Sequence, residues 1–276
     1  MINLENRINK IFKDLKSNNK KAFISFTTAG FPDEDTSLEI IKSIADAGAN
    51  IHEISFPHAE AQADGPIIQL ANIESIKNGI NFEKVINIAK KSREYNQEIG
   101  LVMMGYLNNI FIYGIDKFAK EVSGIIDAVI CVDLPDDVVE ENQLKQALKK
   151  EKIALIKLVT PTTSDERIQK LVKDADGFIY SVNVAGITGV KSAQIDMVNS
   201  QISRIKKYTD LPVVSGFGIK TDDDVKIFSK SIADGIVIGS GIVEKIQEVS
   251  KNESDKTKIA NFVKEFCSKL ITNLNS

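Results

Sequence analysis

Short apolar runs alternate with amphipathic helical segments through almost all of the 276 residues. Apolar runs of this kind are typical of parallel strands that are buried on both faces. Eight such strand–helix units in a chain of about 250 residues favour a closed (β/α)₈ barrel over an open doubly wound sheet. The expected strands cover residues 22–27, 50–55, 100–104, 128–132, 153–158, 177–182, 211–214 and 234–238.

An additional helix is expected before the first strand. Its apolar residues recur at helical spacing, so it carries an apolar stripe that must cover another surface; they are Leu4, Ile8, Ile11, Phe12 and Leu15. The last helix, about residues 256–270, is expected to cover the barrel from outside. No linker or change of composition divides the chain, so we expect residues 1–276 to form one α/β domain, a TIM barrel with an extra N-terminal helix.

Composition excludes several classes of protein. The net charge is −3 and the charges are spread along the chain, which gives no patch for nucleic acid or a membrane surface. Two cysteines, Cys131 and Cys267, indicate a reducing compartment, and with only His52 and His58 beside them no metal centre is expected. The N-terminus lacks the apolar segment of a signal peptide, and no stretch of about 18 apolar residues could span a bilayer. A cytoplasmic protein is expected.

Glu53 stands out because it lies within an apolar strand. Alternation places Ile51, Glu53 and Ser55 on one face of the strand and His52 with Ile54 on the other. A buried carboxylate is costly unless it has a partner or a function, and burial raises its pKa. Glu53 is therefore either a general base or a strand-end residue that reaches water or a lysine. A loop after the strand brings a second carboxylate, Asp64.

Three glycine-bearing segments follow the last three expected strands: Gly186-Ile187-Thr188-Gly189, Ser215-Gly216-Phe217-Gly218-Ile219 and Gly239-Ser240-Gly241. Each could be an ordinary turn. Together, after successive strands of a barrel, they indicate a phosphate site, because such loops and the N-terminus of a following helix present backbone N–H groups to an anion.

Six blocks in order resemble the tryptophan synthase alpha chain, from about Phe23 to Val243. They are Glu53 with Ala63-Asp64-Gly65-Pro66 and Gln69, Met104-Gly105-Tyr106-Leu107-Asn108, Asp133-Leu134-Pro135, Phe178-Ile179-Tyr180 with Gly186-Ile187-Thr188-Gly189, Gly216-Phe217-Gly218, and Gly239-Ser240. The resemblance implies a lyase of tryptophan biosynthesis that splits indole-3-glycerol phosphate into indole and glyceraldehyde 3-phosphate.

By the same resemblance, Glu53 would move protons between the glycerol hydroxyl and the indole ring, and Asp64 would hold the indole N–H. Positioned acids or bases contribute on the order of 10²–10⁴ in rate. Tyr180 would belong to the catalytic pocket, or it is a core aromatic residue. The remaining implied residues are Phe26, Met104, Tyr106, Thr188 and Phe217 for the indole and a lid, and Gly189, Gly218, Gly239 and Ser240 for the phosphate.

The family works with a beta chain in an α₂β₂ heterotetramer, and the pyridoxal phosphate belongs to that partner. The resemblance therefore implies no cofactor in this chain and places the partner contact around Glu60. The loop after Glu53 departs from the family pattern: Ser55 stands for glycine, His58 for an aromatic residue, Ala59 for serine and Ala61 for proline. Ser55 would either bond to Glu53 or narrow the indole slot, and His58 is a surface residue or reports on pH at the partner interface.

Asn183 also departs from the family, in the lid segment, where serine is usual. Two alternative functions stay open. One is another sugar-phosphate lyase or isomerase, for which Lys157 is the nearest candidate for a Schiff base. The other is a weakened or non-catalytic regulatory partner of the beta chain, against which the retention of Glu53 and Asp64 argues.

Overall fold

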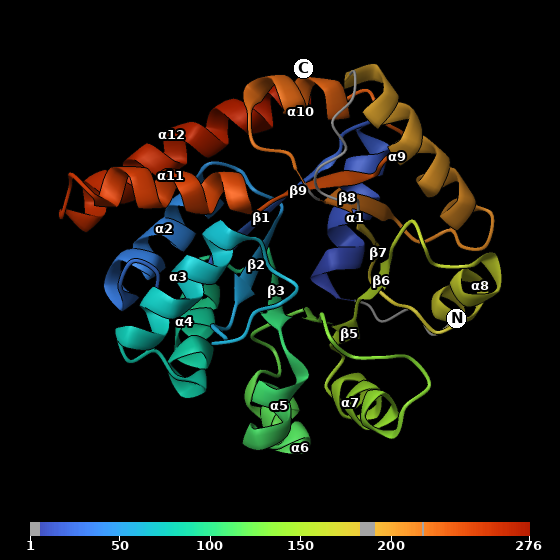
Figure 1. Cartoon of the computed structure of the whole chain (residues 1–276), viewed down its shortest axis with the longest axis horizontal. Coiled ribbons are helices and arrows are strands. Elements are labelled where there is room, and N and C mark those ends of the chain that lie inside the picture. Colours follow the sequence, from blue (N-terminus) through green and yellow to red (C-terminus); the bar gives the residue numbers. More distant parts are fainter. Residues whose placement is uncertain (1–5, 183–190, 217) are drawn as a thin grey trace.

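The strands form the wall of a barrel. The computed structural model describes residues 6–182, 191–216 and 218–276 (Figure 1). Its parallel strands are β1 (Ala22–Thr28), β2 (Ile51–Ser55), β3 (Gly100–Gly105), β4 (Ala128–Cys131), β5 (Ala154–Leu155), β6 (Lys157–Val159), β7 (Ile179–Val182), β8 (Val213–Gly216) and β9 (Gly235–Ile238). They pair in the order β5-β4-β3-β2-β1-β9-β8-β7-β6, which confirms the barrel expected from the sequence.

The fifth expected strand, residues 153–158, is the exception. It is divided at Ile156 into β5, which pairs with β4, and β6, which pairs with β7. Each half therefore bonds to one neighbour only, and the chain itself joins the two ends of the sheet at this place. The barrel is near-closed.

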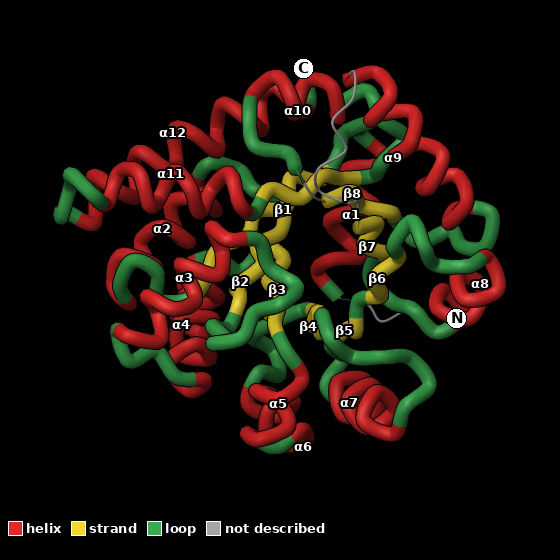
Figure 2. Tube along the Cα trace, in the orientation of Figure 1, coloured by secondary structure: helices red, strands yellow, loops and turns green. Residues whose placement is uncertain are grey.

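The helices surround this wall, except the first, which lies across one end of the barrel (Figure 2). They are α1 (Arg7–Ser17), α2 (Glu34–Asp46), α3 (Pro66–Lys77), α4 (Phe82–Tyr95), α5 (Leu107–Tyr113), α6 (Ile115–Glu121), α7 (Val139–Lys150), α8 (Asp165–Lys173), α9 (Lys191–Lys206), α10 (Asp222–Phe228), α11 (Ser240–Ser250) and α12 (Lys256–Leu274). The two short helices α5 and α6 follow one another directly, and Gly114 (φ +97°) separates them.

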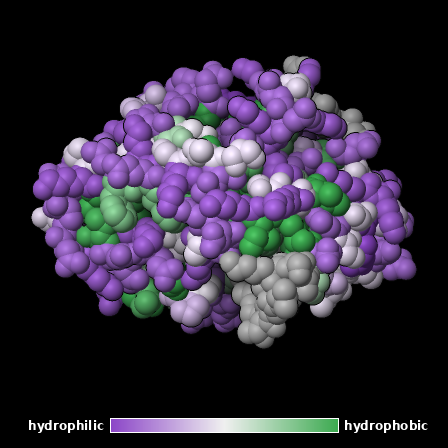
Figure 3. Space-filling view, turned by 90° about the horizontal axis from the view of Figure 1, so that it is seen from above, coloured by the Kyte–Doolittle hydropathy of each residue, from purple (hydrophilic) through white to green (hydrophobic). Residues whose placement is uncertain are grey.

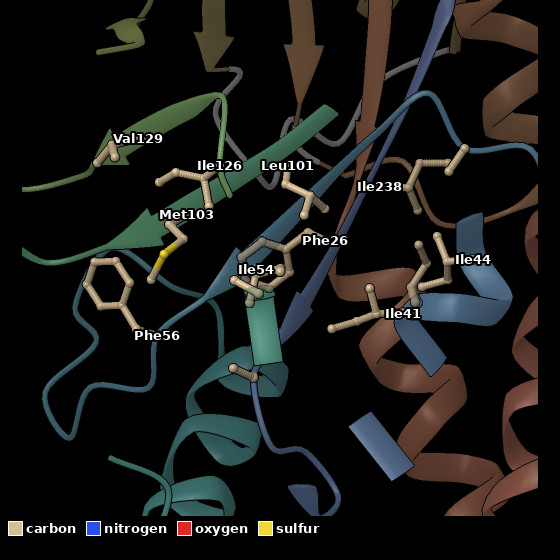
Figure 4. Packing of buried hydrophobic residues seen from close by; sticks show 14 of the residues in the cluster. Phe26, Ile41, Ile44, Ile54, Phe56, Leu101, Met103, Ile126, Val129 and Ile238 are labelled. Carbon is tan, nitrogen blue, oxygen red and sulfur yellow. The ribbon is translucent and has the colours of Figure 1, made fainter. Parts of the chain in front are cut away.

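Two apolar layers result from the alternation of strand side chains. One lies between the wall and the helices, where Ile238 of β9 meets Ile41 and Ile44 of α2 (Figure 4). The other fills the barrel, where side chains such as Ile24 and Ile51 pack together. Burial on both faces explains why the strand sequences are continuous apolar runs.

Helix α1 closes the N-terminal end of the barrel. Ile8 and Phe12 are buried against the interior layer, and the rings of Phe12 and Phe178 lie 5.8 Å apart. The apolar stripe of the first helix thus covers the interior of the barrel. Asp127, immediately before β4, bonds to Arg7 of this helix at 2.9 Å and so ties it to the barrel.

The surface is mostly hydrophilic on the face in Figure 3, with hydrophobic side chains in small separate groups. Within residues 6–182, 191–216 and 218–276, no helix has the length and apolar character needed to cross a membrane.

Candidate active site

A cavity of about 260 Å³ lies at the C-terminal ends of the strands. Active sites of such barrels lie at this end. The cavity brings together most of the site residues expected from the sequence: Phe26, Glu53, Asp64, Met104, Tyr180, Gly218, Gly239 and Ser240. Three others, Thr188, Gly189 and Phe217, lie outside the described residues, as does Asn183.

Glu53 points into this cavity from β2 and is 1% exposed. Burial raises the pKa of its carboxyl to about 8, because removal from water disfavours the charged form. No described residue donates a hydrogen bond to its buried Oε1. The bond from Ser55 that the sequence left open is therefore not made to this oxygen. The side chain is therefore mostly the neutral acid at pH 7, and it is free to exchange a proton with a molecule in the cavity.

Asp64 is held by the loop that joins β2 to α3. Its carboxylate accepts hydrogen bonds from the Tyr106 hydroxyl at 3.2 Å and from Asn72 Nδ2 at 3.4 Å. Gln69 Nε2 also bonds to the main-chain oxygens of Asp64 and Ala61, at 3.0 and 3.1 Å, which fixes the loop. Burial raises the pKa of Asp64, and the two side-chain hydrogen bonds oppose that shift.

Tyr180 approaches the cavity from β7. Burial raises the pKa of its hydroxyl well above the usual value, and the carboxyl groups of Glu53 and Asp64 add to the rise. The three side chains are thus within electrostatic reach of one another. Gly216 on the neighbouring strand β8 makes room for the Tyr180 ring, because a β-carbon at position 216 would lie 2.6 Å from its Cε1.

The N-terminus of α11 also lines the cavity, through Gly239 and Ser240. Gly239 is the N-cap residue, and no side chain in the described part of the chain caps the helix there. Its first N–H groups therefore suit an anion. The neighbouring helix α10 differs, because Thr221 and Asp224 cap each other's backbone N–H groups and occupy that terminus.

Sequence reasoning missed several wall residues of the cavity. They are mostly apolar, and an apolar side chain after a strand carries no signal that separates a substrate wall from core; they are Ala63, Ile67, Ile68, Ile219, Lys220 and Val237. Lys220 bonds to Glu244 of α11 at 3.3 Å. Tyr106, expected to contact indole, reaches the site through Asp64 instead of forming part of this wall.

Lys157 does not have the surroundings of a Schiff-base lysine. Its Nζ lies 2.6 Å from Glu141 and 3.2 Å from Asp136, in helix α7 and the segment before it. These two ion pairs hold the end of the side chain, and Lys157 does not line the cavity that contains Glu53 and Asp64. The described residues also contain no group of three or more His, Cys, Asp or Glu side chains that could hold a metal ion.

The sequence model of the tryptophan synthase alpha chain matches residues 12–271. The chain belongs to the tryptophan synthase alpha chain family. It is thereby an indole-3-glycerol-phosphate lyase of tryptophan biosynthesis. A tryptophan synthase alpha chain uses no cofactor of its own, and the pyridoxal phosphate of the synthase is in the beta chain.

Solved structures agree with this membership of the alpha chain family. A structure from Aquifex aeolicus VF5 is 32% identical, covers 98% of this chain and 99% of its own, and has a TM-score of 0.84. The tryptophan synthase alpha chain from Legionella pneumophila subsp. pneumophila is 29% identical, with 98% and 97% covered and a TM-score of 0.86. Mycobacterium tuberculosis tryptophan synthase, at 24% identity, covers 98% of both chains with a TM-score of 0.86 and supports the fold.

Proposed function

We propose that Glu53 carries out both proton transfers of the lyase reaction. The observation that carries this proposal is a buried carboxyl with a pKa of about 8 in the same cavity as Asp64 and the α11 N-terminus. Glu53 starts as the neutral acid and gives its proton to C3 of the indole ring. The carboxylate that remains then takes the proton of the glycerol hydroxyl as the carbon–carbon bond breaks. Glu53 is restored, and the hydroxyl hydrogen has in effect moved to C3.

Asp64 would stabilise the positive charge that develops on the indole nitrogen when C3 is protonated. A carboxylate does this when it is ionised and fixed in place before the reaction. The hydrogen bonds from Tyr106 and Asn72 support both conditions. Tyr180, beside both carboxyls, would close the apolar part of the site together with Phe26 and Met104.

The substrate phosphate would bind at the N-terminus of α11, on the backbone of Gly239 and the hydroxyl and backbone of Ser240, with Gly218 beside them. The absence of a side-chain cap at this helix end supports the assignment. By their place in the resemblance, Gly189 would join this phosphate group, and Thr188 and Phe217 would close over the indole. Residues 1–276 would work as one catalytic domain.

The test measures indole release from indole-3-glycerol phosphate by the wild-type chain and by Glu53→Gln and Asp64→Asn. Both variants keep the shape of the side chain, and each should lower kcat by on the order of 10²-fold or more. Their affinity for inorganic phosphate should stay close to the wild-type value. Wild-type turnover by Glu53→Gln would refute the role of Glu53, and absence of turnover in the wild type with phosphate still bound would favour the non-catalytic regulatory subunit.

A tryptophan synthase beta chain is the proposed partner, in an α₂β₂ heterotetramer. The proposed contact comprises the loop around Glu60 and helix α5, which His58 and Asn109 join through a 2.9 Å hydrogen bond. Two large apolar side chains of α5 support it, because Phe111 is 57% exposed and Ile112 is 76% exposed. Large exposed apolar groups commonly mark protein interfaces.

Titration of this chain with a beta chain tests the contact. Turnover should rise with the partner. Ile112→Asp should raise at least tenfold the beta-chain concentration that gives half of this increase, and it should leave turnover without the partner unchanged. Phe262→Asp is the control, since Phe262 is 41% exposed on α12. Equal effects of the two substitutions would refute this surface.

A further inference from the structure

His58 is linked to the candidate site through Tyr106, which contacts both His58 and Asp64. Its ring stacks on Tyr106, with centroids 4.6 Å apart and planes 20° apart. The Tyr106 hydroxyl in turn donates a hydrogen bond to Asp64. We propose that His58, tethered by Asn109, is a positioning residue that fixes the ring of Tyr106 and thereby the carboxylate of Asp64. This inference rests on the proposed role of Asp64.

Tyr106 is well placed to transmit this constraint. It is the N-cap residue of α5, so its backbone is fixed at the start of a helix. Its hydroxyl bonds to two consecutive residues, since it accepts the N–H of Ala63 at 2.9 Å and donates to Asp64. A small rotation of the ring would therefore move the loop and the carboxylate together. The stacked His58 ring opposes that rotation on one face.

Asn109 determines how the His58 ring is oriented. Its Oδ1 accepts a hydrogen bond from His58 Nδ1 at 2.9 Å, and Asn109 lies one turn into α5, close to Tyr106. Asn109, which bonds to His58, and Tyr106, on which His58 stacks, thus belong to the same helix and its N-cap. The two contacts together restrict the movement of the imidazole ring. Where the family resemblance leads one to expect an aromatic residue, histidine keeps the flat ring face and adds a polar bond.

Electrostatics point in the same direction. Burial raises the pKa of Asp64, and the hydrogen bonds from Tyr106 and Asn72 and the electrostatic interaction with His58 lower it. Glu53 and Tyr180 line the same cavity as Asp64, and Tyr180 interacts electrostatically with both carboxyls. His58 therefore acts on Asp64 through the position of Tyr106 and through a direct electrostatic interaction, and both effects favour the ionised carboxylate of Asp64.

Kinetic comparison of His58→Ala, His58→Phe and Asn109→Ala in the full chain separates these contributions. His58→Ala removes the stack on Tyr106, the bond to Asn109 and the electrostatic interaction with Asp64. It should lower kcat on the order of tenfold with a smaller change in KM, because Asp64 acts on charge that develops during the reaction. The acidic limb of the pH profile of kcat/KM should move to higher pH. His58→Phe restores the stack and should recover kcat to within about threefold of wild type.

The tether is tested by a double-mutant comparison. Asn109→Ala alone should lower kcat by a few-fold, and in the His58→Phe background it should have no further effect, because phenylalanine cannot use the tether. Gln62→Ala, on an exposed residue of the same loop, is the matched control. This comparison also holds if His58→Ala fails to fold.

Wild-type kcat and an unmoved acidic limb in a folded His58→Ala, or equal effects of Asn109→Ala in both backgrounds, would overturn the inference. Asp64→Asn separates this failure from that of the proposed function. If Asp64→Asn is inactive and His58→Ala is normal, only the positioning role fails. If Asp64→Asn is itself fully active, the role of Asp64 fails first.

Discussion

His52 and Glu53 are consecutive residues of β2 with side chains on opposite faces of the barrel wall. His52 bonds to Ser25 at 2.8 Å and to Thr27 at 3.0 Å, whereas Glu53 lines the cavity. Burial lowers the pKa of His52 to about 3 and raises that of Glu53 to about 8. Both side chains are therefore mainly uncharged at pH 7, and of the two only Glu53 lines the cavity where substrate is expected.

Glu53→Gln should make the protein more stable in alkaline solution while removing activity. The folded carboxyl has a pKa of about 8 against 4.5 in the unfolded chain, so its favourable contribution is complete below pH 4.5 and is lost as the pH rises through 8. Glutamine does not titrate. At pH 9 the variant should exceed the wild type by a few kcal/mol in free energy of unfolding. Urea unfolding at pH 4.5 and 9 checks this, and His52 titrates equally in both proteins.

Gly216→Ala should displace Tyr180 and lower kcat about tenfold or more, because the new β-carbon would occupy the space of the phenol ring. Steady-state kinetics measure the loss. Gly100→Ala serves as a control at the other end of the barrel, where a β-carbon would lie 3.0 Å from Ile51 and 3.3 Å from Ile11. That variant should lose stability and keep its kcat, and equal kcat losses would contradict the explanation.

Asp127→Asn should destabilise the fold by about 3–5 kcal/mol, since it leaves a buried guanidinium without its counter-charge. Arg93 lies 2.7 Å from the Asp127 carboxylate, and both side chains are almost fully buried. The same carboxylate accepts the N–H of Leu101 at 2.9 Å. Thermal or urea unfolding measures the loss. Glu98→Gln, which removes the exposed pair with Lys10, should change stability little.

Ser240→Ala should raise KM and the dissociation constant of inorganic phosphate by a few-fold, because one hydroxyl donor to the anion is lost while the backbone donors remain. Isothermal calorimetry with phosphate measures the second value directly. Ser250→Ala, at the far end of the same helix, is the matched control and should leave both values unchanged. If both substitutions weaken phosphate binding equally, the helix N-terminus is not the phosphate site.

Local sequence signals pointed to only part of the candidate site, and the resemblance to the alpha chain family supplied the rest, such as Tyr180 and Met104. A carboxylate in an apolar strand made Glu53 a candidate general base, and glycines after successive strands indicated a phosphate site that includes Gly239. The roles of Ile67 and Val237 could not be predicted, because apolar residues look alike in a core and in a substrate wall. The bond between Tyr106 and Asp64 joins residues 42 positions apart and has no local signature.

The periodicity of apolar residues by itself determined the alternation of strands and helices, because each element must bury its apolar side chains, and it placed Glu53 on the same face of its strand as Ile51. Only the tertiary structure decided which residues meet. Closure of the sheet divided the fifth strand at Ile156, since each half bonds to a different neighbour. The raised pKa of Glu53 likewise comes from side chains of several strands that together exclude water, and no single segment of the chain encodes that exclusion.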